Sequence, residues 1–203
     1  MSVVDAVGWL AALSSASLAL PQGLKIAVSR SVAGVSTLTW QTMLIAGLAW
    51  TCHGLLTGTP QIIWPNTLLA VTSGWVLWQL CRARRLRPII TFAIPVAVAA
   101  LAFGADLVLG PVAFAAVAFV PGAVGQTSQL RAILRSADTS GVSMVGLLMN
   151  LVNQILWLGY AVPAGEVAVM CVAFPIGVLI AASIASLQYR RTRPAPVPQP
   201  APA

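Results

Sequence analysis

Charged residues are scarce in this chain of 203 residues, where they make up 7% of the sequence. A soluble domain carries about a quarter charged residues. Hydrophobic residues make up 59% of the chain, and the mean hydropathy is +0.91. A water-soluble surface cannot be built from so few charges, so lipid must replace water around much of the exterior. The composition therefore predicts a membrane protein with the lipid bilayer as its solvent.

Residues that build catalytic or metal sites are also few. Cys52, Cys81 and Cys171 lie in or beside apolar runs, without CxxC pairing or clustered histidines, which disfavours a disulfide framework or a zinc site. The chain has no paired carboxylates and no Ser-His-Asp set for an enzyme. Its one lysine, Lys25, lies outside the last apolar run, which excludes a retinal-type photoreceptor. We therefore predict no catalytic residues, no metal and no cofactor.

Long apolar runs are what the sequence has in abundance. Each approaches the ~20 residues that a helix needs to cross a ~30 Å hydrocarbon core. The predicted spans are Val4–Gln22, Thr37–Leu56, Pro60–Cys81, Pro88–Leu109, Pro111–Leu130, Ser143–Val162 and Val167–Leu187. The connections between them are too short for an extramembrane domain. The sequence therefore predicts an all-α membrane protein with seven transmembrane helices.

The few charges are segregated along the chain. All 11 basic residues follow the first, third, fifth or seventh span, which places them on one side. The positive-inside rule makes that side cytoplasmic. Three of the four acidic residues, Asp5, Asp106 and Glu166, fall on the opposite side. We therefore predict a cell-membrane protein with its N-terminus outside and its C-terminus in the cytoplasm, and we interpret the net charge of +7 as a topology signal rather than a nucleic-acid-binding surface.

An internal repeat relates the two halves of the chain. The segment PQGLKIAVSRSVAGVS from Pro21 aligns with SQLRAILRSADTSGVS from Ser128 without a gap. Residues that agree in this register are Gln22 with Gln129, Gly34 with Gly141, Ser36 with Ser143 and Trp50 with Trp157. Both copies run in the same direction across the membrane, because the three spans of the first repeat and the single linker span together make an even number of crossings. The sequence therefore predicts two parallel three-helix repeats joined by a linker helix, a 3+1+3 plan.

This plan divides the chain into residues 1–82 as the first repeat, 83–110 as the linker helix, 111–190 as the second repeat and 191–203 as a disordered proline-rich cytoplasmic tail. Parallel repeats are a known transporter architecture, with the substrate site near the midplane between them. Prolines within helices remove a backbone hydrogen bond and mark predicted hinges. The predicted hinge or gate residues are Pro21, Gln22, Pro65, Pro121, Gln129 and Pro175.

The segments PQGLK, SRSVAGVS, GLAWTCHG and PQIIWPN resemble the PQ-loop transporters, in particular the SWEET and SemiSWEET (MtN3/saliva) sugar facilitators. The resemblance is strongest over Pro21 to Asn66 and extends more weakly through the second half. It implies a 3+1+3 fold and the movement of mono- or disaccharides down their gradients by alternating access. It also implies that Trp50, Asn66 and Trp157 line the sugar pocket, and that Pro21 and Gln22 form the PQ turn.

Helix geometry independently supports Trp50 and Asn66 as partners. Trp50 lies roughly 20 Å from the cytoplasmic start of its helix, and Asn66 roughly 9 Å from the outer start of the next, so both reach a similar depth in a ~30 Å core. An indole face suits the CH surface of a sugar, and an amide suits its hydroxyls. The alternatives are an interfacial position for Trp50 and an interhelical hydrogen bond for Asn66.

The second half lacks the matching asparagine, because its counterpart is Ala173, or Ile176 if the preceding loop is longer. The sixth span instead carries a polar stripe on one helical face. Its members, at i, i+3, i+4 and i+7, are Asn150, Asn153, Gln154 and Trp157. Polar groups are costly in lipid, so we predict that this stripe faces the cavity and makes the pocket asymmetric.

Two further functions stay open beside uniport of a small solute. A PQ-loop-type transporter of amino acids or other metabolites, coupled to protons, would need an ionisable group in the membrane path. The acidic residues lie near span ends or in loops, which leaves His53, for which a packed polar contact is the alternative. A non-transporting receptor on the same fold is the third function. The predicted partners are the solute and the lipid bilayer, and a homo-oligomer stays open as a further one.

Overall fold

The computed structural model describes residues 2–29, 36–135, 139 and 142–192, with the side chains of 17–29 left aside, and these residues form seven helices. The helices are α1 (Val3–Ser29), α2 (Thr37–Thr57), α3 (Pro60–Arg84), α4 (Pro88–Leu109), α5 (Pro111–Arg135), α6 (Met144–Ala164) and α7 (Val167–Thr192). By length and composition, α4 to α7 can each cross a membrane. The prediction of an all-α membrane protein is confirmed; that α1, α2 and α3 also span stays a prediction.

Several helices run further than the apolar spans predicted from the sequence. α1 continues to Ser29, α5 to Arg135 and α7 to Thr192. Hydropathy ends a span where the apolar residues end, whereas the backbone hydrogen bonds of a helix continue past the hydrocarbon core. α1 is also helical through Pro21 and Gln22, where the family resemblance implied a turn. Proline is tolerated within membrane helices because neighbouring groups satisfy the freed backbone.

The ends of α2 and α6 are built alike. Each helix has 21 residues and begins after a serine, Ser36 or Ser143, whose hydroxyl accepts a hydrogen bond from the backbone N–H three residues on. Such caps satisfy a backbone donor that the helix leaves free. Each helix ends at a glycine in the left-handed region, Gly58 with φ +66° or Gly165 with φ +73°. The two serines are as far apart in the sequence as Trp50 and Trp157 are, and so are the two glycines.

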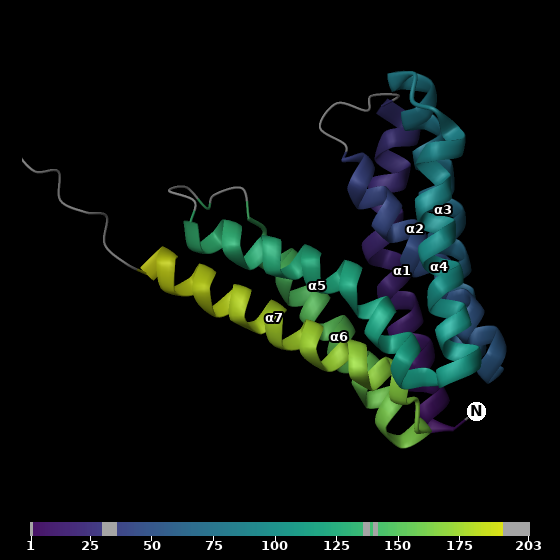
Figure 1. The fold of residues 1–203 in the computed structure, drawn as a ribbon. Coiled ribbons are helices and arrows are strands. Elements are labelled where there is room, and N and C mark those ends of the chain that lie inside the picture. Colours follow the sequence, from purple (N-terminus) through teal and green to yellow (C-terminus); the bar gives the residue numbers. More distant parts are fainter. Residues whose placement is uncertain (1, 30–35, 136–138, 140–141, 193–203) are drawn as a thin grey trace, which may run out of the picture.

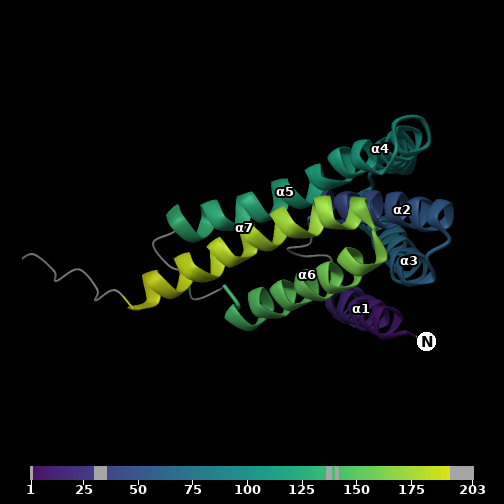
Figure 2. The ribbon, with the colours of Figure 1, turned by 90° about the horizontal axis from the view of Figure 1, so that it is seen from below.

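The helices pack in two groups. In the first, α3 lies between α1 and α2; in the second, α7 lies between α5 and α6. The groups contact each other through α1 with α6 and α2 with α5, while α4 packs against α2, α3 and α5. They approach each other at the end of the molecule that holds the N-terminus and diverge toward the opposite end (Figures 1 and 2). We call these the N-terminal end and the basic end, because the described arginines lie at the latter.

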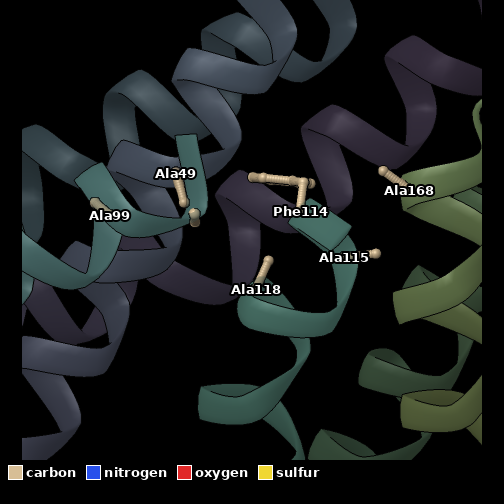
Figure 3. Packing of buried hydrophobic residues seen from close by; sticks show 7 residues of the cluster. Ala49, Ala99, Phe114, Ala115, Ala118 and Ala168 are labelled. Atoms are coloured by element: carbon tan, nitrogen blue, oxygen red, sulfur yellow. The ribbon is translucent and has the colours of Figure 1, made fainter. Parts of the chain in front are cut away.

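Small side chains fill the contact between α2, α4, α5 and α7. We call this cluster the alanine seam; it consists of Ala49, Ala99, Ala102, Phe114, Ala115, Ala118 and Ala168. Phe114, which is fully buried, is the one large side chain among these short alanine side chains (Figure 3). Small residues let membrane helices approach closely. On the outer faces, large apolar side chains such as Ile89 and Val108 are 85% and 80% exposed, as a lipid-facing surface requires.

The predicted hinge residues all lie inside helices. Pro65 is in α3, Pro121 and Gln129 are in α5, and Pro175 is in α7. The side chains of Pro21 and Gln22 lie outside the described residues. Two prolines that the sequence did not single out, Pro95 in α4 and Pro163 in α6, also interrupt helices. That these residues act as hinges stays a prediction.

Candidate solute-binding site

A partly enclosed cavity of about 170 Å³ lies between the two helix groups. Its wall comes from α1, α2 and α3 on one side and from α6 and α7 on the other. The lining residues are Ser15, Trp50, Ile62, Asn66, Asn153, Gln154, Trp157, Val169, Val172 and Ala173. A mostly apolar cavity with a few placed polar groups is typical of a small-molecule site.

The two lining tryptophans are held by different contacts. The ring of Trp50 meets Phe114 and His53 edge-on, at centroid distances of 4.9 and 5.6 Å. The indole of Trp157 instead donates a hydrogen bond from Nε1 to Oγ of Ser15, 2.9 Å away. Ser15 thus fixes a cavity ring of the second group from a helix of the first.

The amides of the cavity have their donor groups partly occupied. Asn66 donates from Nδ2 to the carbonyl of Ile62 in its own helix, at 2.8 Å. Asn153 donates from Nδ2 to Oγ of Ser15, at 2.9 Å, and to the carbonyl of Ala11, at 3.2 Å. These bonds orient the amides. Oδ1 of Asn66 and of Asn153 accepts no hydrogen bond from the described residues, so each oxygen can accept one from a solute hydroxyl.

Five of the predicted site residues meet at this cavity: Trp50, Asn66, Asn153, Gln154 and Trp157. Two do not line it. Asn150 lies one turn along α6 and accepts a hydrogen bond from Nε2 of Gln154 at 3.4 Å. His53 lies behind Trp50 and is 1% exposed. Of the two candidate counterparts of Asn66, Ala173 lines the cavity, whereas Ile176 packs toward Gly122.

Ser15 is the lining residue that sequence reasoning missed. It lies in an apolar helix directly after Ser14 and two residues before Ser17, and nothing in this short run of serines singles it out. One signal was available in the sequence: Ala11 and Ser15 are one helical turn apart and therefore lie on the same face of the helix. Only the packing of α1 against α6, however, brings them to Asn153.

His53 is joined by two carboxylates that sequence reasoning left near span ends. Its Nδ1 is 2.6 Å from Oδ2 of Asp106 on α4, and its Nε2 is 3.8 Å from Oε2 of Glu166, between α6 and α7. The imidazole stacks on Phe114, with ring centroids 4.5 Å apart and planes 9° from parallel. Helix ends distant in sequence converge at the N-terminal end and bring both carboxylates beside His53. That His53 acts in a transport path stays a prediction.

Glu166 also ties the two groups together through Thr59. The hydroxyl of Thr59, between α2 and α3, donates to Oε1 of Glu166 at 2.9 Å. The His53 side chain, together with this hydrogen bond, holds the pKa of the Glu166 carboxyl below its ordinary value despite partial burial. Polar contacts between the groups therefore close the N-terminal end of the molecule.

The cavity and the closed end differ in charge. The lining of the cavity is uncharged, whereas His53, Asp106 and Glu166 lie behind it. Among the described residues, no group of three or more His, Cys, Asp or Glu side chains is arranged to hold a metal ion. The cavity can therefore bind a neutral, polar solute by hydrogen bonds and ring contacts.

Apolar helices packed around an uncharged cavity define this chain as a helical membrane protein with a candidate small-solute site. No protein-family model and no curated protein matches the chain. Among solved structures, it is similar to a eukaryotic SWEET transporter whose structure was solved at 3.7 Å resolution, with a TM-score of 0.73 over 95% of this chain and 100% of that one. At 17% identity, this likeness establishes the fold. The predicted resemblance to the SWEET transporters is confirmed at that level.

Proposed function

We propose that this protein is a SWEET-like facilitative transporter of small neutral solutes, with mono- or disaccharides as the leading class. The observation that carries the proposal is the uncharged cavity between two helix groups, with Trp50 and Trp157 presenting indoles and Asn66 and Asn153 presenting amides. Indoles suit the CH faces of a sugar ring, and amides suit its hydroxyls. No ion gradient is needed for such a uniporter, since the solute moves down its own gradient.

The proposed scaffold is the 3+1+3 plan, with α1–α3 and α5–α7 as parallel repeats and α4 as the linker helix. It is supported by the matching order of packing, in which α3 and α7 are the middle helices. The matching serine caps and left-handed glycines of α2 and α6 support it further. The proposed units keep the boundaries 1–82, 83–110 and 111–190, with residues 191–203, outside the described part, as the tail.

The proposed orientation places the N-terminal end outside the cell and the basic end in the cytoplasm. The arginines of the basic end support it by the positive-inside rule. In this orientation, the two helix groups diverge toward the cytoplasmic side (Figure 1). Rocking of the groups about the cavity would then expose it alternately to the two sides.

The cavity favours sugars over amino acids as substrates. A zwitterionic amino acid needs charged or dipolar partners for its ammonium and carboxylate groups, which are costly to bury unpaired. The carboxylates of Asp106 and Glu166 do not line the cavity; both contact His53, whose ring meets Trp50 edge-on. A neutral polyol requires only the hydrogen bonds that the amides offer.

The test is uptake of radiolabelled glucose and sucrose into proteoliposomes, comparing the wild type with Trp50→Ala and with Trp64→Ala. Trp64 is a matched control, because it is 65% exposed on α3 and does not line the cavity. We expect saturable uptake by the wild type and the control, and its loss in Trp50→Ala. Absence of sugar flux from folded wild-type protein would contradict the proposal; saturable uptake of an amino acid would then favour the amino-acid transporter.

A further inference from the structure

The cluster behind the cavity has a feature that substrate binding does not explain. His53 is 1% exposed and stacked on Phe114, and its Nε2 has no hydrogen-bond partner among the described residues. An unpaired buried nitrogen is costly. Its nearest acceptor is Oε2 of Glu166, 3.8 Å away. A packed histidine with a purely structural role would have both nitrogens satisfied.

The three ionisable side chains come from three separately moving parts of the proposed transporter. His53 belongs to the first helix group, Asp106 to α4, and Glu166 to the start of α7 in the second group. The contact of His53 with Asp106 is short, at 2.6 Å, and the contact with Glu166 is longer and spans the boundary between the groups. Opening the N-terminal end must separate His53 from Glu166.

The charge of the imidazole decides whether the contact with Glu166 attracts or repels. A protonated His53 carries N–H groups at both nitrogens, so it faces both carboxylates with positive charge. A neutral His53 that donates from Nδ1 to Asp106 presents a lone pair at Nε2 to the Glu166 carboxylate. In a site this poorly hydrated, the first arrangement attracts and the second repels.

We propose that His53, Asp106 and Glu166 form a proton-binding site whose occupancy closes the N-terminal end of the cavity. The site takes one proton from water on that side while the end is open and encloses it when the groups meet. This inference rests on the proposed transporter, where it adds a proton-controlled outer gate. The position of His53 against Trp50, at 5.6 Å, places the proton directly behind the solute site.

Other ionisable groups near this site are few. Tyr160 from α6 is buried at the same end and packs edge-on against Trp157. α3 and α5 also pack against α2, but their charged residues lie at the basic end. Asp5 on α1 is at the N-terminal end and contacts Gln61 of α3, within the first group, at 3.4 Å. Asp5 therefore offers a control carboxylate outside the cluster.

The experiment measures the distance between spin labels across the N-terminal end as a function of pH. Labels at Leu56→Cys on α2 and Ala164→Cys on α6 occupy exposed positions beside the cluster, with the three native cysteines replaced by alanine. In lipid nanodiscs between about pH 5 and 8, we expect the short distance to dominate at low pH and a longer one to grow as His53 loses its proton. One titrating group changes the ratio by up to about tenfold per pH unit.

Variants separate the proton site from ordinary packing. Glu166→Gln keeps an acceptor for Thr59 and offers an amide donor to the neutral imidazole, so we expect the short distance at every pH. His53→Gln should make the ratio independent of pH, and Asp5→Asn should behave as the wild type. A wild-type ratio that does not change with pH, or a Glu166→Gln variant that opens with pH as the wild type does, would overturn the proposal.

The same samples distinguish this inference from the proposed function. Sugar uptake by a protein with a pH-independent label distance would overturn the proton site and leave the transporter standing. A pH-dependent distance in a protein that moves no sugar would support the proton site and count against the sugar transporter. If His53→Gln does not fold, Glu166→Gln still decides, because its amide is close in size to the carboxylate that it replaces.

Discussion

In the first half of the chain, the cavity receives Trp50 from α2 and Asn66 from α3. In the second half it receives Trp157 from α6, while the position on α7 that matches Asn66 is Ala173. The amides of the second half come instead from α6, one helix earlier. The backbone caps at the ends of α2 and α6 are nevertheless alike. The comparison teaches that two similar scaffolds can present different polar groups. A solute in the cavity therefore meets different hydrogen-bonding groups on its two sides.

The largest effect is expected from removing the indoles that both halves share. Trp50→Ala should reduce sugar uptake by at least about tenfold, which corresponds to ~1.4 kcal/mol of lost binding. Trp157→Ala should have a similar effect if the halves contribute equally. Uptake in proteoliposomes at matched protein levels measures both. Uptake at the wild-type rate by either variant would show that the tryptophan it lacks does not bind the solute.

A glycine pair tests the packing that underlies the similarity. A Cβ at Gly47 would lie 2.6 Å from the backbone nitrogen of Ala70, so Gly47→Ala must push α2 away from α3. We expect a cost of about 1–3 kcal/mol, seen as a lower melting temperature in detergent. In the second half of the chain, Gly177→Ala in α7 would place its Cβ 3.6 Å from Gln154, which is an ordinary contact. This variant should leave the melting temperature nearly unchanged. Equal losses would contradict this packing.

Moving the unmatched amide sharpens the comparison between the halves. Asn66→Ala should weaken uptake by several-fold, since one hydrogen bond contributes about 1 kcal/mol. Ala173→Asn places an amide at the matching position of α7. If the halves are related as proposed, the double variant should recover part of the uptake lost in Asn66→Ala. A double variant no better than Asn66→Ala would show that the two positions are not equivalent for the solute.

The smallest effect concerns the left-handed glycines. Gly58→Ala and Gly165→Ala each force a Cβ into a positive-φ conformation, at a cost of about 1 kcal/mol. Both should lower the melting temperature by similar amounts without changing the cavity. Gly74→Ala is the control, because Gly74 is helical and has open space around its Cβ position. Unequal shifts in melting temperature at Gly58 and Gly165 would indicate that the two turns contribute differently to stability.

Much of the fold could be predicted because lipid imposes it. A chain in hydrocarbon must satisfy its backbone within helices, so apolar length alone located α2, α3, α4 and α7 to within a few residues at their starts. The ends of α1, α5 and α7 were missed, because polar and basic residues continue a helix beyond the core without an apolar signal.

The candidate site was predictable where a pattern repeated. The repeated tryptophans and the polar stripe of α6 pointed to four lining residues, and the family resemblance added Asn66. The stripe wrongly included Asn150, because residues spaced i to i+7 extend over two helical turns and the cavity reaches α6 only from Asn153 to Trp157. No sequence pattern singled out Ser15. The partners of His53 could not be found from sequence, because 53 residues separate it from Asp106 and only the packing of α2 against α4 joins them.

The alanine seam has a mechanical consequence. Side chains that interlock must leave their rotamers before two helices can slide, whereas an alanine has no side-chain torsion to change. Helices that cross on methyl groups can therefore rotate against one another without rotamer changes. The buried ring of Phe114 is the one large side chain in the alanine seam, and it contacts both Trp50 and His53. A movement of α5 would thus reach the cavity and the proton site in a single step.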